Sequence, residues 1–195
     1  MNSRKVVKLF FTTLLVGSIS GAIVGFILDY HVYTEGTFLN TFFGLIWLLG
    51  ICAAFSLISQ MGFFAYLTVH RFGLGLFKSQ KLWNYVQVII IAFVVFDLIY
   101  FRYIAFAQPN ETIIHYLVMP IILLFYGLLV AYLKAKDTNQ GAFIPSLFFI
   151  VVITVIEWVP ALTVNDPKWL WLYLTPLITA NTWQVLILHR LTQTK

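Results

Sequence analysis

Long apolar runs dominate the chain, and short polar segments separate them. Six runs lie near residues 9–28, 41–69, 83–105, 113–133, 142–164 and 169–188. About 20 residues of α-helix, rising about 1.5 Å each, cross about 30 Å of hydrocarbon, so each run is long enough to span a bilayer. The runs are continuous and lack the alternation of membrane β-strands. The pattern predicts an all-α membrane protein, a six-helix transmembrane bundle that forms one integral membrane domain over residues 1–195.

Composition agrees with this prediction. Of 195 residues, 61% are hydrophobic and 10% are charged, whereas soluble domains carry about 25% charged residues. So few polar side chains cannot cover a water-exposed surface, which excludes a soluble enzyme and a disordered chain. The net charge is +5, and the basic residues lie beside the apolar runs. We therefore expect the anionic partner to be the headgroups of a lipid bilayer and not a nucleic acid. The single cysteine, Cys52, excludes an intrachain disulfide.

The distribution of lysine and arginine predicts the orientation of the bundle. Six spans place both termini on one side of the membrane. Ten of the 12 basic residues fall on that side, and only Arg102 and Lys168 fall on the other. The positive-inside rule therefore predicts a multi-pass protein of the cell membrane with cytoplasmic N and C termini. The ten residues are Arg4, Lys5, Lys8, Arg71, Lys78, Lys81, Lys134, Lys136, Arg190 and Lys195.

The first run contains Gly17, Gly21 and Gly25 in steps of four. This spacing places the three glycines on one helix face, where another backbone can approach closely. We predict a helix-packing groove. It is occupied either by a helix of the same bundle, which such spacing favours, or by a transmembrane helix of a partner protein or of a second copy.

Two acidic residues lie inside apolar runs, Asp97 in the third and Glu157 in the fifth. Arg102 follows on the third run and His115 begins the fourth. All four fall in the predicted outer half of the bundle, so we expect an intramembrane polar cluster of Asp97, Arg102, His115 and Glu157. Ionisable residues in membranes are costly and point to function. A structural staple and a sensing or ligand-binding role both stay open.

Basic and apolar residues mix where the second run ends. His70, Arg71, Phe72, Lys78 and Lys81 belong to this segment. It is typical of a strip lying among lipid headgroups, and it is also a candidate cytoplasmic face for a partner. The sequence has no H-E-x-x-H, G-x-x-x-x-G-K-[ST] or C-x-x-C motif. We therefore predict no catalytic residue, no metal site and no cofactor.

Four stretches of the chain resemble one known family. They cover residues 62–75, 92–103, 142–145 and 157–160, and include His70-Arg71, Asp97, Arg102 and Glu157-Trp158-Val159-Pro160. The chain is similar to the KbaA family, the KinB-signalling pathway activation proteins of endospore-forming bacteria. The resemblance covers essentially the whole chain. It implies an integral membrane protein that activates a membrane sensor histidine kinase of the KinB type, which feeds the sporulation phosphorelay. It supplies no catalytic residue.

Two functional hypotheses follow. In the first, the protein is a non-enzymatic regulator that activates the kinase through transmembrane and cytoplasmic-loop contacts, because a two-state sensor responds only to differential contacts with its two states. In the second, the protein is a small transporter or ligand carrier that uses Asp97 and Glu157 in a polar cavity. Homo-oligomerisation is left open by the sequence.

Overall fold

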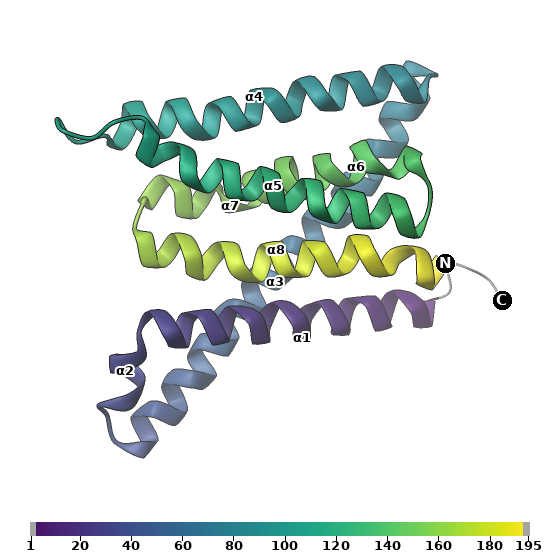
Figure 1. Ribbon diagram of the computed structural model, residues 1–195. Helices are drawn as coiled ribbons and strands as arrows, with labels where there is room; N and C mark the ends of the chain where they lie inside the picture. The colour runs from purple at the N-terminus through teal and green to yellow at the C-terminus, as the bar shows by residue number, and fades with distance from the viewer. Residues whose placement is uncertain (1–2, 193–195) are drawn as a thin grey trace. The chain divides into compact units, whose positions relative to one another are not determined.

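The computed structural model describes residues 3–192, which are helical with no strand among them (Figure 1). The predicted all-α class is therefore confirmed. Lys195, counted above for the orientation, lies outside the described residues. The helices are α1 (Ser3–Leu28), α2 (Tyr30–Thr34), α3 (Phe38–Phe77), α4 (Gln80–Phe106), α5 (Ile114–Asp137), η1 (Gln140–Ala142), α6 (Phe143–Phe148), η2 (Phe149–Ile153), α7 (Thr154–Val164) and α8 (Pro167–Thr192).

Five helical segments of the described chain are long and apolar enough to cross a membrane. They are α1, α3, α4, α5 and the continuous segment Gln140–Val164. The sixth predicted span coincides with α8 but is not among the five, since its C-terminal half carries the polar residues Thr179, Asn181, Thr182 and Gln184. The count of six spans and the cytoplasmic termini therefore stay predictions. With 40 residues, α3 is about 60 Å long at 1.5 Å per residue, which exceeds the hydrocarbon thickness.

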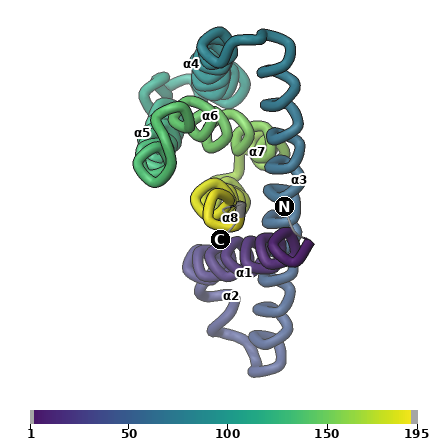
Figure 2. The backbone as a smooth tube through the Cα atoms, turned by 90° about the vertical axis from the view of Figure 1, so that its right-hand side faces the viewer, coloured from purple at the N-terminus to yellow at the C-terminus, as the bar shows by residue number. Residues whose placement is uncertain are grey.

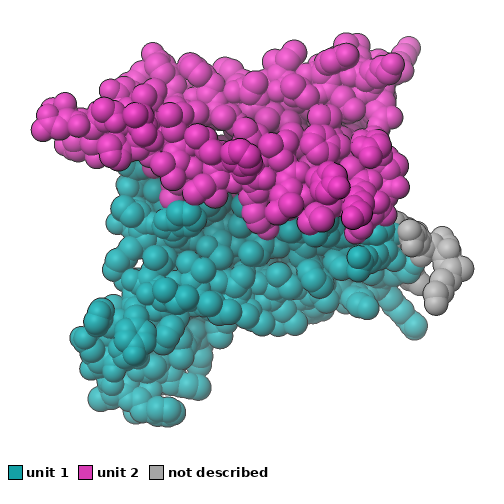
Figure 3. Space-filling model, viewed as in Figure 1, with its two compact units in different colours: residues 1–62, 157–195 teal, residues 63–156 magenta. Residues whose placement is uncertain are grey.

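The chain divides into two compact units (Figure 3). Unit 1 contains residues 1–62 and 157–195, and unit 2 contains residues 63–156. Unit 1 therefore holds α1, α2, the first part of α3, most of α7 and α8. Unit 2 holds the rest of α3, α4, α5, η1, α6, η2 and the start of α7. The sequence-based prediction of one integral membrane domain stays a prediction.

In unit 1, α1 and α8 lie side by side along their lengths (Figures 1 and 2). Hydroxyl groups link them, because Ser20 Oγ lies 2.6 Å from Thr179 Oγ1, and the indole of Trp183 donates to Thr12 Oγ1 at 3.1 Å. Such side-chain hydrogen bonds hold helices together where the surroundings offer no water. The interior of α7 is anchored by Trp158, which is fully buried.

In unit 2, the core is formed by α6 and η2. Phe149 and Ile150 are at most 1% exposed, and η2 is a π-helical stretch inside an otherwise α-helical segment. Tyr66 on α3 stacks on Phe148 with ring centroids 5.5 Å apart. Gly127 on α5 allows Val151 to approach, since a Cβ there would lie 2.8 Å from its Cγ2. Aromatic stacking and a glycine contact therefore bring three helical segments together.

The turn between α3 and α4 contains a strained residue. Lys78 has a φ of 51°, and the next residue, Ser79, caps α4 by accepting the Leu82 N–H at 3.4 Å. A residue with a Cβ loses about 1–2 kcal/mol in the left-handed region, whereas glycine does not. We therefore expect Lys78→Gly to raise the free energy of unfolding by about 1 kcal/mol, measured by denaturant titration in detergent micelles.

Lys78→Ala is the matched control, because it removes the same charge but keeps the Cβ. It is expected to leave stability nearly unchanged. Equal stabilisation by the two variants would show that the ammonium group, and not the backbone conformation, is the destabilising feature.

Candidate functional site

The predicted glycine groove lies inside unit 1. A Cβ at Gly17 would lie 2.7 Å from Ser56 Cβ on α3, and one at Gly21 would lie 2.8 Å from Cys52 Sγ on the same helix. The other neighbours of the three glycines belong to α3 and α8: Leu48, Leu172 and Pro176. Ser56 Oγ also donates to the Thr13 carbonyl of α1 at 3.0 Å. The face of Gly17, Gly21 and Gly25 therefore receives helices of this chain.

Glu157 lies in unit 1 and is 7% exposed. Its Oε2 accepts the amide N–H of Asn181 at 2.8 Å. Asn181 Oδ1 in turn accepts the hydroxyl of Ser59 at 2.8 Å. The three side chains come from α7, α8 and α3. Sequence reasoning missed Ser59 and Asn181, although a polar residue within a long apolar run was the signal that marked Glu157 itself.

The other three members of the predicted cluster, Asp97, Arg102 and His115, lie in unit 2. No hydrogen bond or ion pair among the described residues joins Asp97 to Arg102 or to His115. Asp97 is half-buried, and its Oδ1 is buried without a hydrogen-bond partner within the described chain. His115 is exposed, and its Nδ1 lies 3.3 Å from the Thr112 carbonyl oxygen.

Arg102 instead lies beside residues of α5. Its guanidinium carbon is 5.6 Å from the centroid of the Tyr116 ring, and Nη1 lies 4.0 Å from Met119 Sδ. A cation over an aromatic face is attracted by the ring quadrupole. The contact therefore joins the predicted outer ends of α4 and α5.

The loop between these helices is organised by Glu111. Its Oε2 accepts the backbone N–H of Gln108 at 3.2 Å and the hydroxyl of Tyr116 at 2.9 Å. These two hydrogen bonds, the first being the larger cause, hold the pKa of Glu111 below its ordinary value because they favour the carboxylate form. The contact between Glu111 and Tyr116 was not predicted, since no sequence pattern indicates that these two side chains meet.

The predicted cytoplasmic segment separates into an inward and an outward part. The inward part centres on His70, whose Nδ1 accepts the indole N–H of Trp83 at 3.0 Å. Tyr66 donates to the Pro145 carbonyl at 2.8 Å and accepts the amide N–H of Gln87 at 3.0 Å. These contacts join α3, α4 and α6 within unit 2. His70 is therefore a member of a structural network.

The outward part consists of Arg71, Phe72, Lys78 and Lys81, which are all exposed. Phe72 is 71% exposed. We call these four residues the basic strip. They lie on both sides of the α3–α4 turn, so three cationic side chains and an aromatic ring are presented together near one helical hairpin.

Two hollows lie in unit 1. An apolar groove of about 710 Å³ follows one face of α3 and is lined by Phe43, Ile46, Trp47, Gly50, Ile51 and Ala54. A smaller pocket of about 220 Å³ lies between the adjoining ends of α1 and α8. Asp29 and Lys168 line this pocket and form an ion pair across it. Neither hollow is lined by Asp97 or Glu157.

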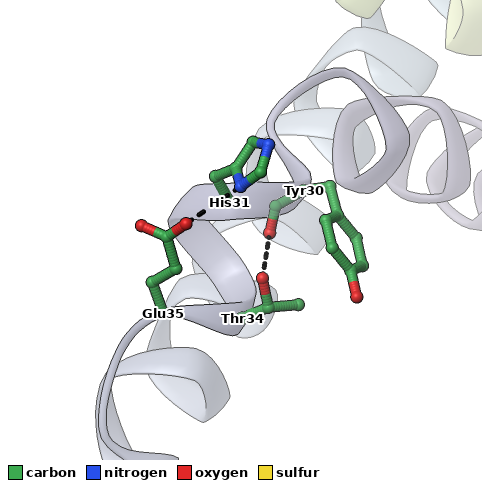
Figure 4. A network of polar contacts seen from close by, with 4 residues as sticks. All are labelled: Tyr30, His31, Thr34 and Glu35. Carbon is green, nitrogen blue, oxygen red and sulfur yellow. Dashed lines mark hydrogen bonds and ion pairs between the residues drawn. The ribbon is translucent and has the colours of Figure 1, made fainter.

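The short helix α2 follows α1 in unit 1 and carries exposed polar contacts (Figure 4). His31 Nδ1 lies 2.9 Å from Glu35 Oε1, and Thr34 donates to the Tyr30 carbonyl at 3.0 Å. The His31 and Glu35 side chains are 84% and 73% exposed. Exposed pairs of this kind contribute little to stability, so they only support one turn of surface helix.

Comparisons with known proteins match nearly the whole chain. The family described as "KbaA: KinB-signalling pathway activation in sporulation" matches residues 17–191. The chain is 46% identical over 195 residues to the "KinB-signaling pathway activation protein" of Bacillus subtilis strain 168, covering 97% of this chain and 98% of that protein. No solved structure matches.

Proposed function

We propose, from the premise that this chain belongs to the KbaA family of KinB-signalling pathway activation in sporulation, that it activates a membrane sensor histidine kinase of that pathway. The single observation that carries the proposal is 46% identity over 97% of the chain. At this identity and coverage the two chains share a fold. The proposed partner is the kinase itself, and the proposed location is the cell membrane with both termini cytoplasmic.

The protein is proposed to act without catalysis, by contacts that favour the active state of the kinase. A binding partner shifts a two-state equilibrium only by its differential affinity for the two states. The basic strip supports a cytoplasmic contact, because Arg71, Phe72 and Lys81 are exposed while neighbouring His70 is held in the helix network. The same strip has the composition of a surface that binds anionic lipid headgroups.

Transmembrane contacts are proposed to use the apolar groove on α3. A Cβ at Gly50 would meet nothing within 4 Å, and Ala54 lies four residues later on the same face. Small residues at this spacing let a second helix approach closely. The glycine face of α1 is already covered by α3 and α8, so we assign the intermolecular contact to this groove.

No observation favours the transporter alternative. It needs Asp97 and Glu157 in one water-accessible cavity. Neither lines the groove or the pocket described above. We therefore propose one function only.

The test uses Bacillus subtilis cells that lack their own relative of this chain. Expression of the chain is expected to restore the number of heat-resistant spores. The combined variant Arg71→Glu and Lys81→Glu is expected to insert normally but to restore few spores, because reversed charges oppose contact with the partner. Crosslinking of tagged wild-type protein in native membranes is expected to recover the kinase.

Lys8→Glu is the control, since it reverses an exposed charge on the same predicted side of the membrane but outside the basic strip. It is expected to restore spores as wild type does. Equal loss in the control would remove the basic strip from the mechanism. Restoration in cells that also lack the KinB kinase would contradict the proposal as a whole.

A further inference from the structure

Polar side chains gather in the core of unit 1, where an apolar interior is expected. Each is at most 8% exposed. A polar group transferred out of water without a hydrogen bond is energetically costly. This concentration of polar groups therefore needs a physical reason. The buried polar residues of unit 1 are Thr13, Ser18, Ser56, Ser59, Gln60, Glu157, Asn181 and Gln184.

The centre of this core is the hydrogen-bonded chain from Ser59 through Asn181 to Glu157. Asn181 is fully buried and uses its carbonyl oxygen toward Ser59 and its amide N–H toward Glu157, both at 2.8 Å. The asparagine orientation follows from these partners, because a hydroxyl donates to its oxygen and a carboxyl oxygen accepts from its nitrogen. One oxygen of the Glu157 carboxyl is thereby satisfied.

The second oxygen of the Glu157 carboxyl is not satisfied. Glu157 Oε1 is buried without a hydrogen-bond partner in the described part of the chain. Gln184 Oε1, one helical turn beyond Asn181 on α8, is a second buried acceptor without one. Unit 1 therefore holds a buried carboxyl oxygen and a buried amide oxygen that lack a donor, besides the hydroxyl of Thr13, and the carboxyl oxygen belongs to the only buried acid of unit 1 among the described residues.

No cationic side chain compensates Glu157. Within the described residues it forms no ion pair with lysine, arginine or histidine. The other buried polar residues of unit 1 among the described residues are uncharged, and the one that contacts Glu157 directly is Asn181. Tyr173 on α8 is the titratable neighbour that interacts electrostatically with Glu157. A lone carboxylate in such surroundings is costly unless a positive charge joins it.

We propose that Glu157, oriented by Asn181 and Ser59, is a binding site for one monovalent cation, either a proton or a sodium ion. A single carboxylate balances one positive charge, and its Oε1 is buried without a hydrogen-bond partner in the described part of the chain, so this oxygen is open to a proton or to a hard monovalent ion. Divalent ions generally require more carboxylate ligands. The site joins α3, α7 and α8, so its occupancy controls how tightly three helices of unit 1 hold together.

The experiment is infrared spectroscopy of the purified full-length protein in lipid nanodiscs. Spectra of wild type and Glu157→Gln are compared across a series of pH values, in sodium chloride and in choline chloride of equal ionic strength. Bound protons appear as the C=O stretch of a protonated carboxyl, and bound sodium appears as a sodium-dependent shift of the carboxylate bands. Glu157→Gln is expected to abolish whichever signal is found. Glu35→Gln, which changes an exposed glutamate, is expected to leave it intact.

A protonated band without sodium dependence identifies the ligand as a proton, and a sodium-dependent carboxylate shift identifies it as sodium. A Glu157 carboxylate band that responds neither to pH nor to sodium would overturn the proposal. Asn181→Leu is the second test if Glu157→Gln does not fold. It keeps the carboxyl but removes the hydrogen bond to Oε2, and it is expected to shift the band. These outcomes do not depend on whether the kinase is the partner.

Discussion

Replacing Gly17 with alanine is expected to lower the free energy of unfolding by about 1–3 kcal/mol, the range for overpacking a tight core. The added Cβ would lie 2.7 Å from Ser56 Cβ and 3.2 Å from the Pro176 carbonyl oxygen. Neither neighbour can easily retreat, since one is backbone and Ser56 is hydrogen-bonded to Thr13. Denaturant titration in detergent micelles, followed by circular dichroism, measures the change.

Gly50→Ala is the matched control in the same unit. Nothing lies within 4 Å of the added Cβ, and alanine favours a helix over glycine by about 0.8–1 kcal/mol. This variant is therefore expected to be as stable as wild type or slightly more stable. Equal destabilisation of the two variants would contradict the packing described for α1, α3 and α8.

The contrast between a glycine packed inside unit 1 and the open Gly50 also separates effects on packing from effects on partner binding. A bulky residue at Gly21 would displace Cys52 and Pro176 inside unit 1, so any lost partner association would follow from a damaged core. A bulky residue at Gly50 fills the groove on α3 without an internal clash. If Gly50→Leu loses contact with the kinase, the loss can therefore be attributed to the blocked groove and not to a damaged core.

Trp83→Ala is expected to have the largest effect in unit 2, a loss of about 3–5 kcal/mol, as for other buried large-to-small substitutions. The indole is 6% exposed, donates to His70 and stacks on Phe77 with centroids 5.6 Å apart. It also lies against Gly73, where a Cβ would come within 2.6 Å of the ring. Its removal opens a cavity and frees the end of α3 from α4.

Two further variants separate the contribution of the Trp83 hydrogen bond from that of its buried ring. Trp83→Phe keeps an aromatic ring but loses the hydrogen bond to His70. It is expected to lower the free energy of unfolding by about 1 kcal/mol. Trp47→Ala removes a tryptophan that is 70% exposed and is expected to change stability little. Comparable losses for Trp47→Ala and Trp83→Ala, measured by thermal unfolding in micelles, would argue against a buried network around His70.

The apolar pattern predicted the helices well. The run at 9–28 ends where α1 ends, and the run at 142–164 coincides with η1 through α7. Hydropathy suffices for this because a membrane forces each long apolar segment to satisfy its backbone internally, as a helix. The π-helical η2 was not predicted, since its five apolar residues have no composition that distinguishes them from their neighbours.

The candidate sites were predicted less completely. Sequence position suggested that Asp97, Arg102, His115 and Glu157 meet at one depth. The structure shows the Arg102 guanidinium against the Tyr116 ring and a hydrogen bond from Asn181 to Glu157, and the meeting of the four residues at one depth stays a prediction. Depth along a helix follows from residue number, but the direction in which a side chain points around the helix does not, because it depends on which neighbour covers each face.

The sequence by itself determined the helical class, the positions of the apolar runs and the bias of basic residues. It also indicated the KbaA family, and the comparisons confirm this family. These are properties of single segments, and they follow from local hydrophobicity and identity. Only the tertiary structure decided that the glycine face of α1 is filled by its own chain, that His70 turns inward to Trp83, and that Asn181 links Glu157 to Ser59 by hydrogen bonds. Each of these is a contact between residues distant in sequence, and such contacts are fixed by close packing between helices, which no single segment encodes.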